Sequence, residues 1–139
     1  MPRLVLDDPF VAGRPCVKLT AGGPFLASPI ELVCAVDTGN RYQLFLTGHS
    51  RQRLGLDSAL FWPSGVLLMN GTTKFPGGLL TTLLTVTWAG RRRPNLPAHF
   101  AIVGSIRPSA IDAYVGADFF TDEILEIDHA RGRVRVSVP

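Results

Sequence analysis

Short apolar stretches separated by turn residues recur along almost the whole chain, and this spacing is the feature that most restricts its fold. Residues 15–20 alternate between apolar and polar types, which is typical of a strand with one buried face. Residues 30–36 form an almost unbroken apolar run with one charge, Glu31, as in a strand buried on both faces. Many short strands with frequent turn signals indicate an all-β barrel or sandwich.

Further strands and two short helices are expected on the same grounds. The dipeptide Asn70-Gly71 favours a type I′ turn, so a hairpin is predicted around it. Gly55 is placed to end a helical turn, and Asp118 is placed to cap another. The hairpin strands are expected at residues 66–69 and 72–75, the helical turns at 50–56 and 119–123, and further strands at 42–46, 79–88, 99–103, 124–128 and 133–136.

The composition fits one domain, residues 1–139. With 46% hydrophobic and 18% charged residues, the chain is too apolar for a disordered segment, and its apolar excess suggests a surface for self-association. No apolar run reaches the about 18 residues of a membrane span, and the first residues lack a signal-peptide pattern. We therefore expect a cytoplasmic protein with no membrane partner. Cys16 and Cys34 have no metal-ligand spacing and are expected to be buried, and no metal or other cofactor is predicted.

An aspartate follows the most apolar strand directly, in the tripeptide Asp37-Thr38-Gly39. An ionised carboxylate is costly to bury unless it is paired or hydrogen-bonded. The Thr38 hydroxyl can donate a hydrogen bond, and the Gly39 backbone can approach closely and adopt unusual φ angles. The three residues can thus direct donors at a carboxylate, although an ordinary Asx-type turn explains the tripeptide alone equally well.

The neighbourhood of this tripeptide resembles the retropepsin-like aspartic proteases, particularly their small bacterial members. In that family a buried strand delivers an Asp-Thr/Ser-Gly loop, and a short helix ending in Leu-Gly-Leu often follows, as Leu54-Gly55-Leu56 does here. A pair of apolar residues and a glycine before a C-terminal helix is similar to residues 114–120, and a flap hairpin between the two motifs is similar to residues 68–73. The resemblance covers roughly residues 15–136. It implies a closed β-barrel with one short C-terminal helix, which assembles as a homodimer.

The resemblance also implies an activity, that of an aspartic endopeptidase. Each subunit would supply Asp37, and the paired carboxylates would share a proton and activate water against an extended peptide or protein substrate. Thr38 would join the two loops across the two-fold axis, and Gly39 would donate its backbone N–H to the carboxylate. The implied substrate-binding residues are Asn40, Met69, Asn70, Gly71, Thr72, Val115 and Gly116. Asn40 departs from the small residue usual in the family, which leaves the shape of the substrate floor open.

Two other functions are weighed against the protease. A retropepsin-fold dimerisation or peptide-binding module without catalysis fits the same motifs, because fold does not fix activity. The run Arg91-Arg92-Arg93 and the net charge of +3 allow a nucleic-acid-binding barrel. A solvated hairpin loop is the preferred interpretation of the arginines, since no aromatic residues interleave with them. Asp112, Asp122 and Asp128 are expected to be solvated turn residues, and the scattered histidines to bind no metal.

Overall fold

A computed structural model of the chain describes residues 1–22, 28–40, 42–55, 62–65, 68–69, 73–74, 79–101 and 107–139. Strands make up most of these residues, and helix is limited to two short segments within them. In this part of the chain no helix has the length and apolar character needed to cross a membrane.

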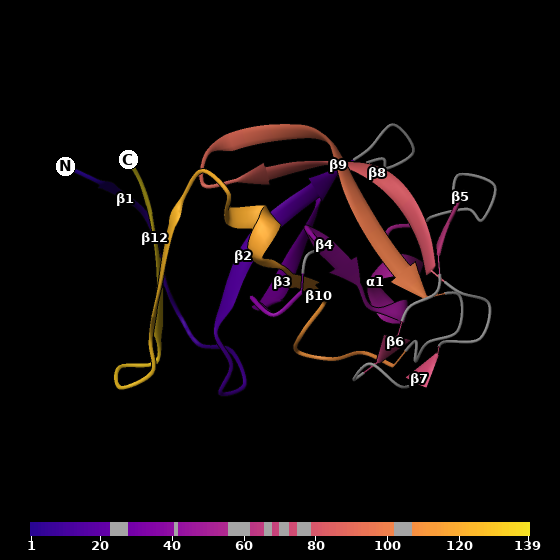
Figure 1. Ribbon diagram of the computed structural model, residues 1–139, viewed down its shortest axis with the longest axis horizontal. Coiled ribbons are helices and arrows are strands. Elements are labelled where there is room, and N and C mark those ends of the chain that lie inside the picture. The colour runs from indigo at the N-terminus through magenta and orange to yellow at the C-terminus, as the bar shows by residue number, and fades with distance from the viewer. Residues whose placement is uncertain are drawn as a thin grey trace.

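Six strands of the described residues close into a barrel (Figure 1). Their order around the barrel is β2, β3, β10, β4, β9 and β8, and pairing of β8 with β2 completes the ring. A further strand, β5 (Trp62–Gly65), pairs with β8. The six strands are β2 (Cys16–Gly22), β3 (Ile30–Val36), β4 (Leu44–Leu46), β8 (Leu79–Trp88), β9 (Arg91–Ala101) and β10 (Ala113–Val115). The spacing predicted an all-β barrel or sandwich, and the structure confirms the barrel.

The barrel is filled from alternate positions of its strands. On β2, Val17, Leu19 and Ala21 are at most 2% exposed, while Lys18 between them faces solvent. A fully buried Val or Leu side chain stabilises the fold by about 1.5–3 kcal/mol relative to an exposed one, so this alternation fixes which face of the strand turns inward. Cys16 and Cys34 are both free and buried, as expected.

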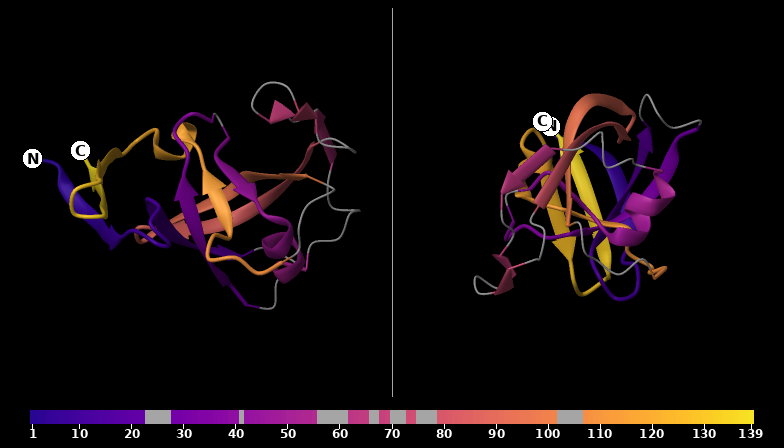
Figure 2. Two further views of the ribbon diagram at one scale, coloured as in Figure 1. Left: turned by 90° about the horizontal axis from the view of Figure 1, so that it is seen from below. Right: turned by 90° about the vertical axis from the view of Figure 1, so that its right-hand side faces the viewer.

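A separate three-stranded sheet contains both chain termini. It consists of β1 (Arg3–Pro9), β12 (Arg133–Val138) and β11 (Ile124–Asp128), with β12 in the centre. Figures 1 and 2 show this sheet at one end of the barrel, with the N- and C-termini close together. The predicted terminal hairpin is confirmed, because β11 and β12 pair from Ile124↔Ser137 to Asp128↔Arg133.

The first helix matches the sequence prediction. Helix α1 (Gly48–Arg53) begins after Thr47, whose hydroxyl accepts a hydrogen bond from the Ser50 backbone N–H at 3.2 Å. Gly55 follows the helix with a φ of +60°, a left-handed conformation that glycine adopts without steric cost.

The second helix differs from the prediction. Residues Ala117–Phe120 form a 3₁₀ turn, η2, whose N-cap is Gly116 without a side-chain cap. The prediction that Asp118 caps a helix at residues 119–123 is therefore wrong. The backbone of η2 is already anchored because the Ala117 N–H donates to the Asn40 carbonyl at 3.0 Å, so the turn begins one residue before Asp118.

The arginine run is also placed differently. Arg91–Arg93 begins strand β9, and only Ala89 and Gly90 connect it to β8. Both connecting residues have positive φ, 49° and 76°, which is the geometry of a tight type I′ turn. The prediction that these arginines form a loop is therefore wrong. Alanine is uncommon at positive φ, so Ala89-Gly90 gives only a weak turn signal in the sequence. Residues 94–95 continue the strand through a bulge at which Asn95 has a φ of +56°.

The expected flap hairpin is visible in part. Strands β6 (Leu68–Met69) and β7 (Thr73–Lys74) pair antiparallel, with Met69 opposite Thr73. Asn70, Gly71 and Thr72, the predicted turn and substrate contacts, lie outside the described residues.

Candidate active site

Strand β10 runs between two strands that are neighbours in the sequence. It pairs parallel with β3 at Tyr114↔Ala35 and antiparallel with β4 at Tyr114↔Phe45. The segment between β3 and β4, which contains Asp37, therefore has to pass over the end of β10. This arrangement brings together predicted site residues from two distant parts of the chain, 37–40 and 115–116.

Backbone hydrogen bonds fix the loop to β10 and to the residues after it. The Asp37 N–H donates to the Val115 carbonyl at 2.8 Å, and the Gly116 N–H donates to the Gln43 carbonyl at 3.3 Å. Within the loop, the Asn40 N–H donates to the Asp37 carbonyl at 3.2 Å. Both ends of the loop are thus held by the main chain, which leaves the Asp37 side chain free for other contacts.

Gly116 makes this close crossing possible. A Cβ atom at this position would lie 2.5 Å from the Asn40 carbonyl oxygen, and nearer still to that of Tyr42. Such contacts are with backbone atoms that other hydrogen bonds hold in place, so no larger residue fits. Gly116 therefore acts as a spacer beneath the Asp37 loop.

The Asp37 carboxylate is half-buried and accepts a hydrogen bond from an unexpected donor. The Asn40 side-chain Nδ2 donates to Asp37 Oδ2 at 2.5 Å. The resemblance implied a donor in the Gly39 backbone, but no such bond is present among the described residues, and Gly39 has no positive φ. The Asn40 amide binds Oδ2, whereas the carboxylate oxygen nearer to Gly39 is Oδ1, and the donor role of Gly39 in the assembled site stays a prediction.

Thr38 and Gly39 form the exposed tip of the loop. A Cβ atom built on Gly39 would have ordinary van der Waals clearance, since its nearest neighbour is Asp37 Oδ1 at 3.6 Å. Met69 lies on β6 of the partly described hairpin, and Val115 is completely buried beneath the loop. Among the described residues of the loop, the accessible side chains are those of Asp37, Thr38 and Asn40.

Asp112, expected to be a solvated turn residue, is instead a buried junction that the sequence analysis missed. It is 7% exposed, its Oδ2 accepts the Val33 N–H at 2.8 Å, and its Oδ1 forms an ion pair with Arg53 at 3.2 Å. The Asp112 carbonyl also accepts hydrogen bonds from the Thr47 N–H and hydroxyl. This residue joins helix α1 to the strands that flank Asp37. The available sequence signal for a buried Asp112 was its position directly before three apolar residues, 113–115, and this signal is weak.

An aromatic cluster of Tyr42, Phe45 and His99 lies directly after the loop in the sequence and on strand β9. The ring of Tyr42 lies 5.7 Å from that of Phe45 and 5.2 Å from that of His99, and His99 Nδ1 is 2.8 Å from the Thr81 hydroxyl. Burial raises the pKa of Tyr42 and lowers the pKa of His99, because it disfavours the charged form of each. Both groups are therefore neutral near pH 7. In the described part of the chain, no three metal-ligating side chains gather into a group.

Comparisons with known proteins give no assignment. No protein-family model matches the chain, and no curated protein matches it. The function is therefore inferred from the geometry of the Asp37 loop.

Proposed function

We propose that the chain is an aspartic endopeptidase, active as a homodimer in which each subunit contributes Asp37. The observation that carries the proposal is Asp37 itself, a half-buried residue at the end of a buried barrel strand, whose main chain is anchored to β10. A structural turn does not require an acid at this position. The exposed Thr38 and Gly39 beside it provide a surface on which a second copy can pack.

The chemistry explains why two chains are needed. The sequence contains one Asp-Thr-Gly tripeptide, so one subunit has one such carboxylate. Two carboxylates held close together cannot both ionise cheaply, and they share one proton. The ionised member accepts a proton from a bound water, which attacks the scissile carbonyl carbon. The protonated member donates a hydrogen bond to the carbonyl oxygen as negative charge develops there.

The remaining site residues take supporting roles in this proposal. Thr38 joins the two loops across the two-fold axis, and Asn40 orients the carboxylate through its amide. Gly116 keeps β10 close enough to support the loop, and residues 69–72 close over an extended peptide. The enzyme is proposed to work in the cytoplasm, without a metal, another cofactor or a nucleic acid.

The test is peptide cleavage by wild type and by Asp37→Asn. The substitution keeps the size of the side chain but removes the ionisable group, so we expect cleavage to fall at least about 10³-fold, comparable to the loss of a catalytic group. Asp122→Asn is the matched control, since Asp122 is exposed on the segment after η2. Activity should also rise more steeply than linearly with protein concentration if a dimer is the active form.

The possible outcomes separate the candidate functions. Cleavage that persists in Asp37→Asn would exclude Asp37 as the catalytic group. If neither wild type nor variant cleaves any peptide, while wild type is a folded dimer, the non-catalytic dimerisation or peptide-binding module becomes the better explanation. Binding to DNA or RNA that weakens steeply with salt would instead support the nucleic-acid-binding alternative.

A further inference from the structure

The register of β2 with β3, extended beyond its last pair Cys16↔Ala35, leads toward Arg14 and Asp37. In this antiparallel pair Cys16 lies opposite Ala35, and the Val36 N–H donates to the Pro15 carbonyl at 2.9 Å. Continuing the same register by two residues beyond Cys16↔Ala35 places Arg14 across from Asp37. Directly opposite residues of an antiparallel pair project to the same face, with Cβ atoms about 4.5–5.5 Å apart.

A tight turn holds the backbone of Arg14 in this position. The Arg14 N–H donates to the Val11 carbonyl at 3.0 Å, and the Val11 N–H donates to the Arg14 carbonyl at 2.9 Å. The two residues between them, Ala12 and Gly13, have φ angles of 51° and 74°, as in a type I′ turn. The side chain of Arg14 therefore starts from a rigid base.

The guanidinium of Arg14 lies over an aromatic ring of strand β10. Its Cζ is 5.4 Å from the ring centroid of Tyr114, whose position on β10 is opposite Ala35. Beneath lies a small apolar cluster formed by Cys16, Ala35, Ile111, Val11, Val33 and Tyr114. Burial raises the pKa of the Cys16 thiol, and a hydrogen bond to the Val11 carbonyl and the charge of Arg14 oppose this effect. A cation thus lies on an apolar floor on the same face as the Asp37 loop.

The charge of Arg14 is not neutralised within the described part of the chain. Five other arginines form ion pairs there with carboxylates: Arg53, Arg93, Arg131, Arg133 and Arg135. Arg14 forms none and is exposed, and Asp37 takes its hydrogen bond from Asn40. A planar guanidinium that is already oriented by an aromatic ring loses little freedom when it binds a carboxylate through two parallel hydrogen bonds.

We propose that Arg14 is a specificity-determining residue that selects peptides with an aspartate or glutamate beside the scissile bond. The inference rests on the proposed function, because it places the cut at Asp37. Arg14 lies one strand from Asp37, and a side chain in an extended peptide repeats on the same face about every 6.6–6.8 Å. The guanidinium therefore reaches a substrate residue next to the bond or one position further. In the proposed dimer, one Arg14 lies on each side of the cut.

The experiment compares peptides that differ only in glutamate or glutamine at these positions. At about pH 6 the substrate glutamate is ionised, so its hydrogen bonds to Arg14 are charge-assisted. We expect wild type to cleave the glutamate peptide with a kcat/KM roughly tenfold or more higher, the factor that one charge-assisted hydrogen bond provides. Arg14→Gln should abolish this preference, and Arg14→Glu should favour a lysine peptide instead.

The matched control is Arg92→Gln, which removes the same charge from an exposed residue of β9. Arg92 pairs with Thr87 of β8, and Thr87 pairs with Thr20 of β2, six residues along the chain from Arg14. This variant should keep the glutamate preference of wild type. Sedimentation of Arg14→Gln is measured in parallel. A shift from dimer to monomer would show that Arg14 serves the subunit contact, and would overturn the proposal.

A binding measurement separates this proposal from the proposed function. Fluorescence anisotropy of the same peptides is measured with Asp37→Asn and with Asp37→Asn/Arg14→Gln. If nothing is cleaved but glutamate peptides bind more tightly only when Arg14 is present, the protease proposal fails and the role of Arg14 stands. If Asp37-dependent cleavage is equal for glutamate and glutamine peptides, the role of Arg14 fails and the protease stands. No glutamate preference in either assay, including no measurable binding, overturns the role of Arg14.

Discussion

At the residue scale, the candidate site requires that residue 116 has no Cβ atom, as in glycine. The carbonyl groups of Asn40 and Tyr42 occupy the space that a Cβ atom of residue 116 would need, and the hydrogen bonds from Ala117 and Gly116 hold the same segment in place. Because both neighbours are backbone, neither can rotate away as a flexible side chain would. Space at this position, and not conformational freedom, is the reason for glycine.

Gly116→Ala should therefore destabilise the protein strongly. We expect a loss of about 3 kcal/mol in the free energy of unfolding, at the upper end of what overpacking costs, measured by urea denaturation. Gly39→Ala is the matched control, because its Cβ would meet Asp37 Oδ1 at an ordinary 3.6 Å, and it should change stability by no more than about 0.5 kcal/mol. Equal stability of the two variants would contradict this account of Gly116.

Individual residues of the site were predictable to different degrees. Asp37 could be found because an acid directly after an apolar run is conspicuous in any β sequence. The contact of Asn40 with its carboxylate could not, because it depends on how a side chain folds back over a turn. Asp112 was misjudged for a related reason. Its partners Val33 and Arg53 are 79 and 59 residues away, and burial created by such distant partners leaves no local pattern.

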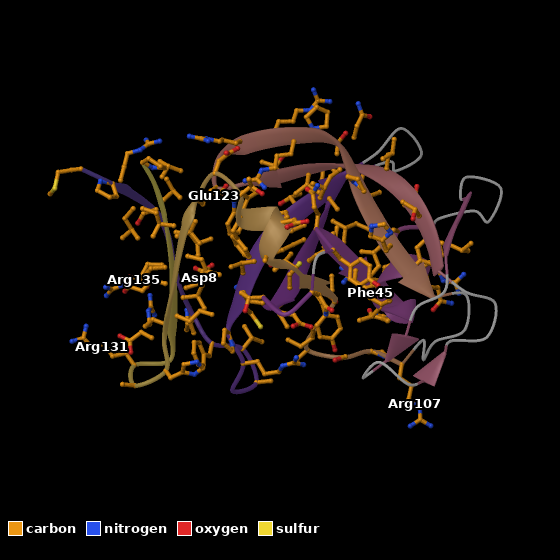
Figure 3. The ribbon with its side chains drawn as sticks, viewed as in Figure 1. Asp8, Phe45, Arg107, Glu123, Arg131 and Arg135 are labelled. Atoms are coloured by element: carbon orange, nitrogen blue, oxygen red, sulfur yellow. The ribbon has the colours of Figure 1, made fainter. Side chains whose placement is uncertain are left out.

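At the scale of elements, a polar clamp joins the β8–β9 hairpin to the segment after η2. Glu123 Oε1 accepts a hydrogen bond from Trp88 Nε1 at 3.0 Å and forms an ion pair with Arg93. Arg93 also donates to the Phe119 carbonyl at 2.7 Å, and its guanidinium carbon lies 4.7 Å from the ring centroid of Phe119. The Glu123 side chain is only 2% exposed, and Figure 3 shows it between the hairpin and the 3₁₀ turn.

This clamp explains why the arginine run was misread from the sequence. Arg91 and Arg92 are exposed, as a solvated loop would require, and only Arg93 is partly buried. The distinction depends on Glu123, which lies 30 residues later. In contrast, strand β3, helix α1 and the terminal hairpin were predicted because their signals are local: apolar runs, a glycine after a helix, and alternation around a turn.

Arg93→Ala should destabilise the protein by about 3 kcal/mol, because it leaves the buried Glu123 carboxylate without its counter-charge. The matched control is Arg131→Ala. Its partner Asp128 lies 3.9 Å away on the surface, and such pairs contribute about 0–1 kcal/mol. Thermal or urea unfolding measures both variants, and the double variant Arg93→Ala/Glu123→Ala should recover part of the loss. If Arg93→Ala costs no more than Arg131→Ala, the clamp contributes nothing to stability.

For the whole molecule, the burial of four titratable groups contributes to how stability depends on pH. Cys34 is completely buried, and burial raises the pKa of its thiol well above the ordinary 9.0, with the charge of Asp112 acting in the same direction. Burial likewise raises the pKa values of Cys16 and Tyr42 and lowers that of His99 from 6.5. Each shift favours the neutral form of the group. The folded protein therefore protonates His99 less readily at low pH, and deprotonates Cys16, Cys34 and Tyr42 less readily at high pH, than the unfolded chain does.

The free energy of unfolding should consequently be highest between about pH 6.5 and 9, the ordinary pKa values of histidine and cysteine. Below this range the unfolded chain binds a proton at His99 more readily than the folded chain does, so stability falls as pH decreases. Above it the unfolded chain loses the thiol protons first, so stability falls as pH increases. Urea unfolding from pH 5 to 10.5 measures both limbs. His99→Asn should flatten only the acid limb and Cys34→Ala only the alkaline one, whereas unchanged limbs in these variants would assign the pH dependence to groups other than His99 and Cys34.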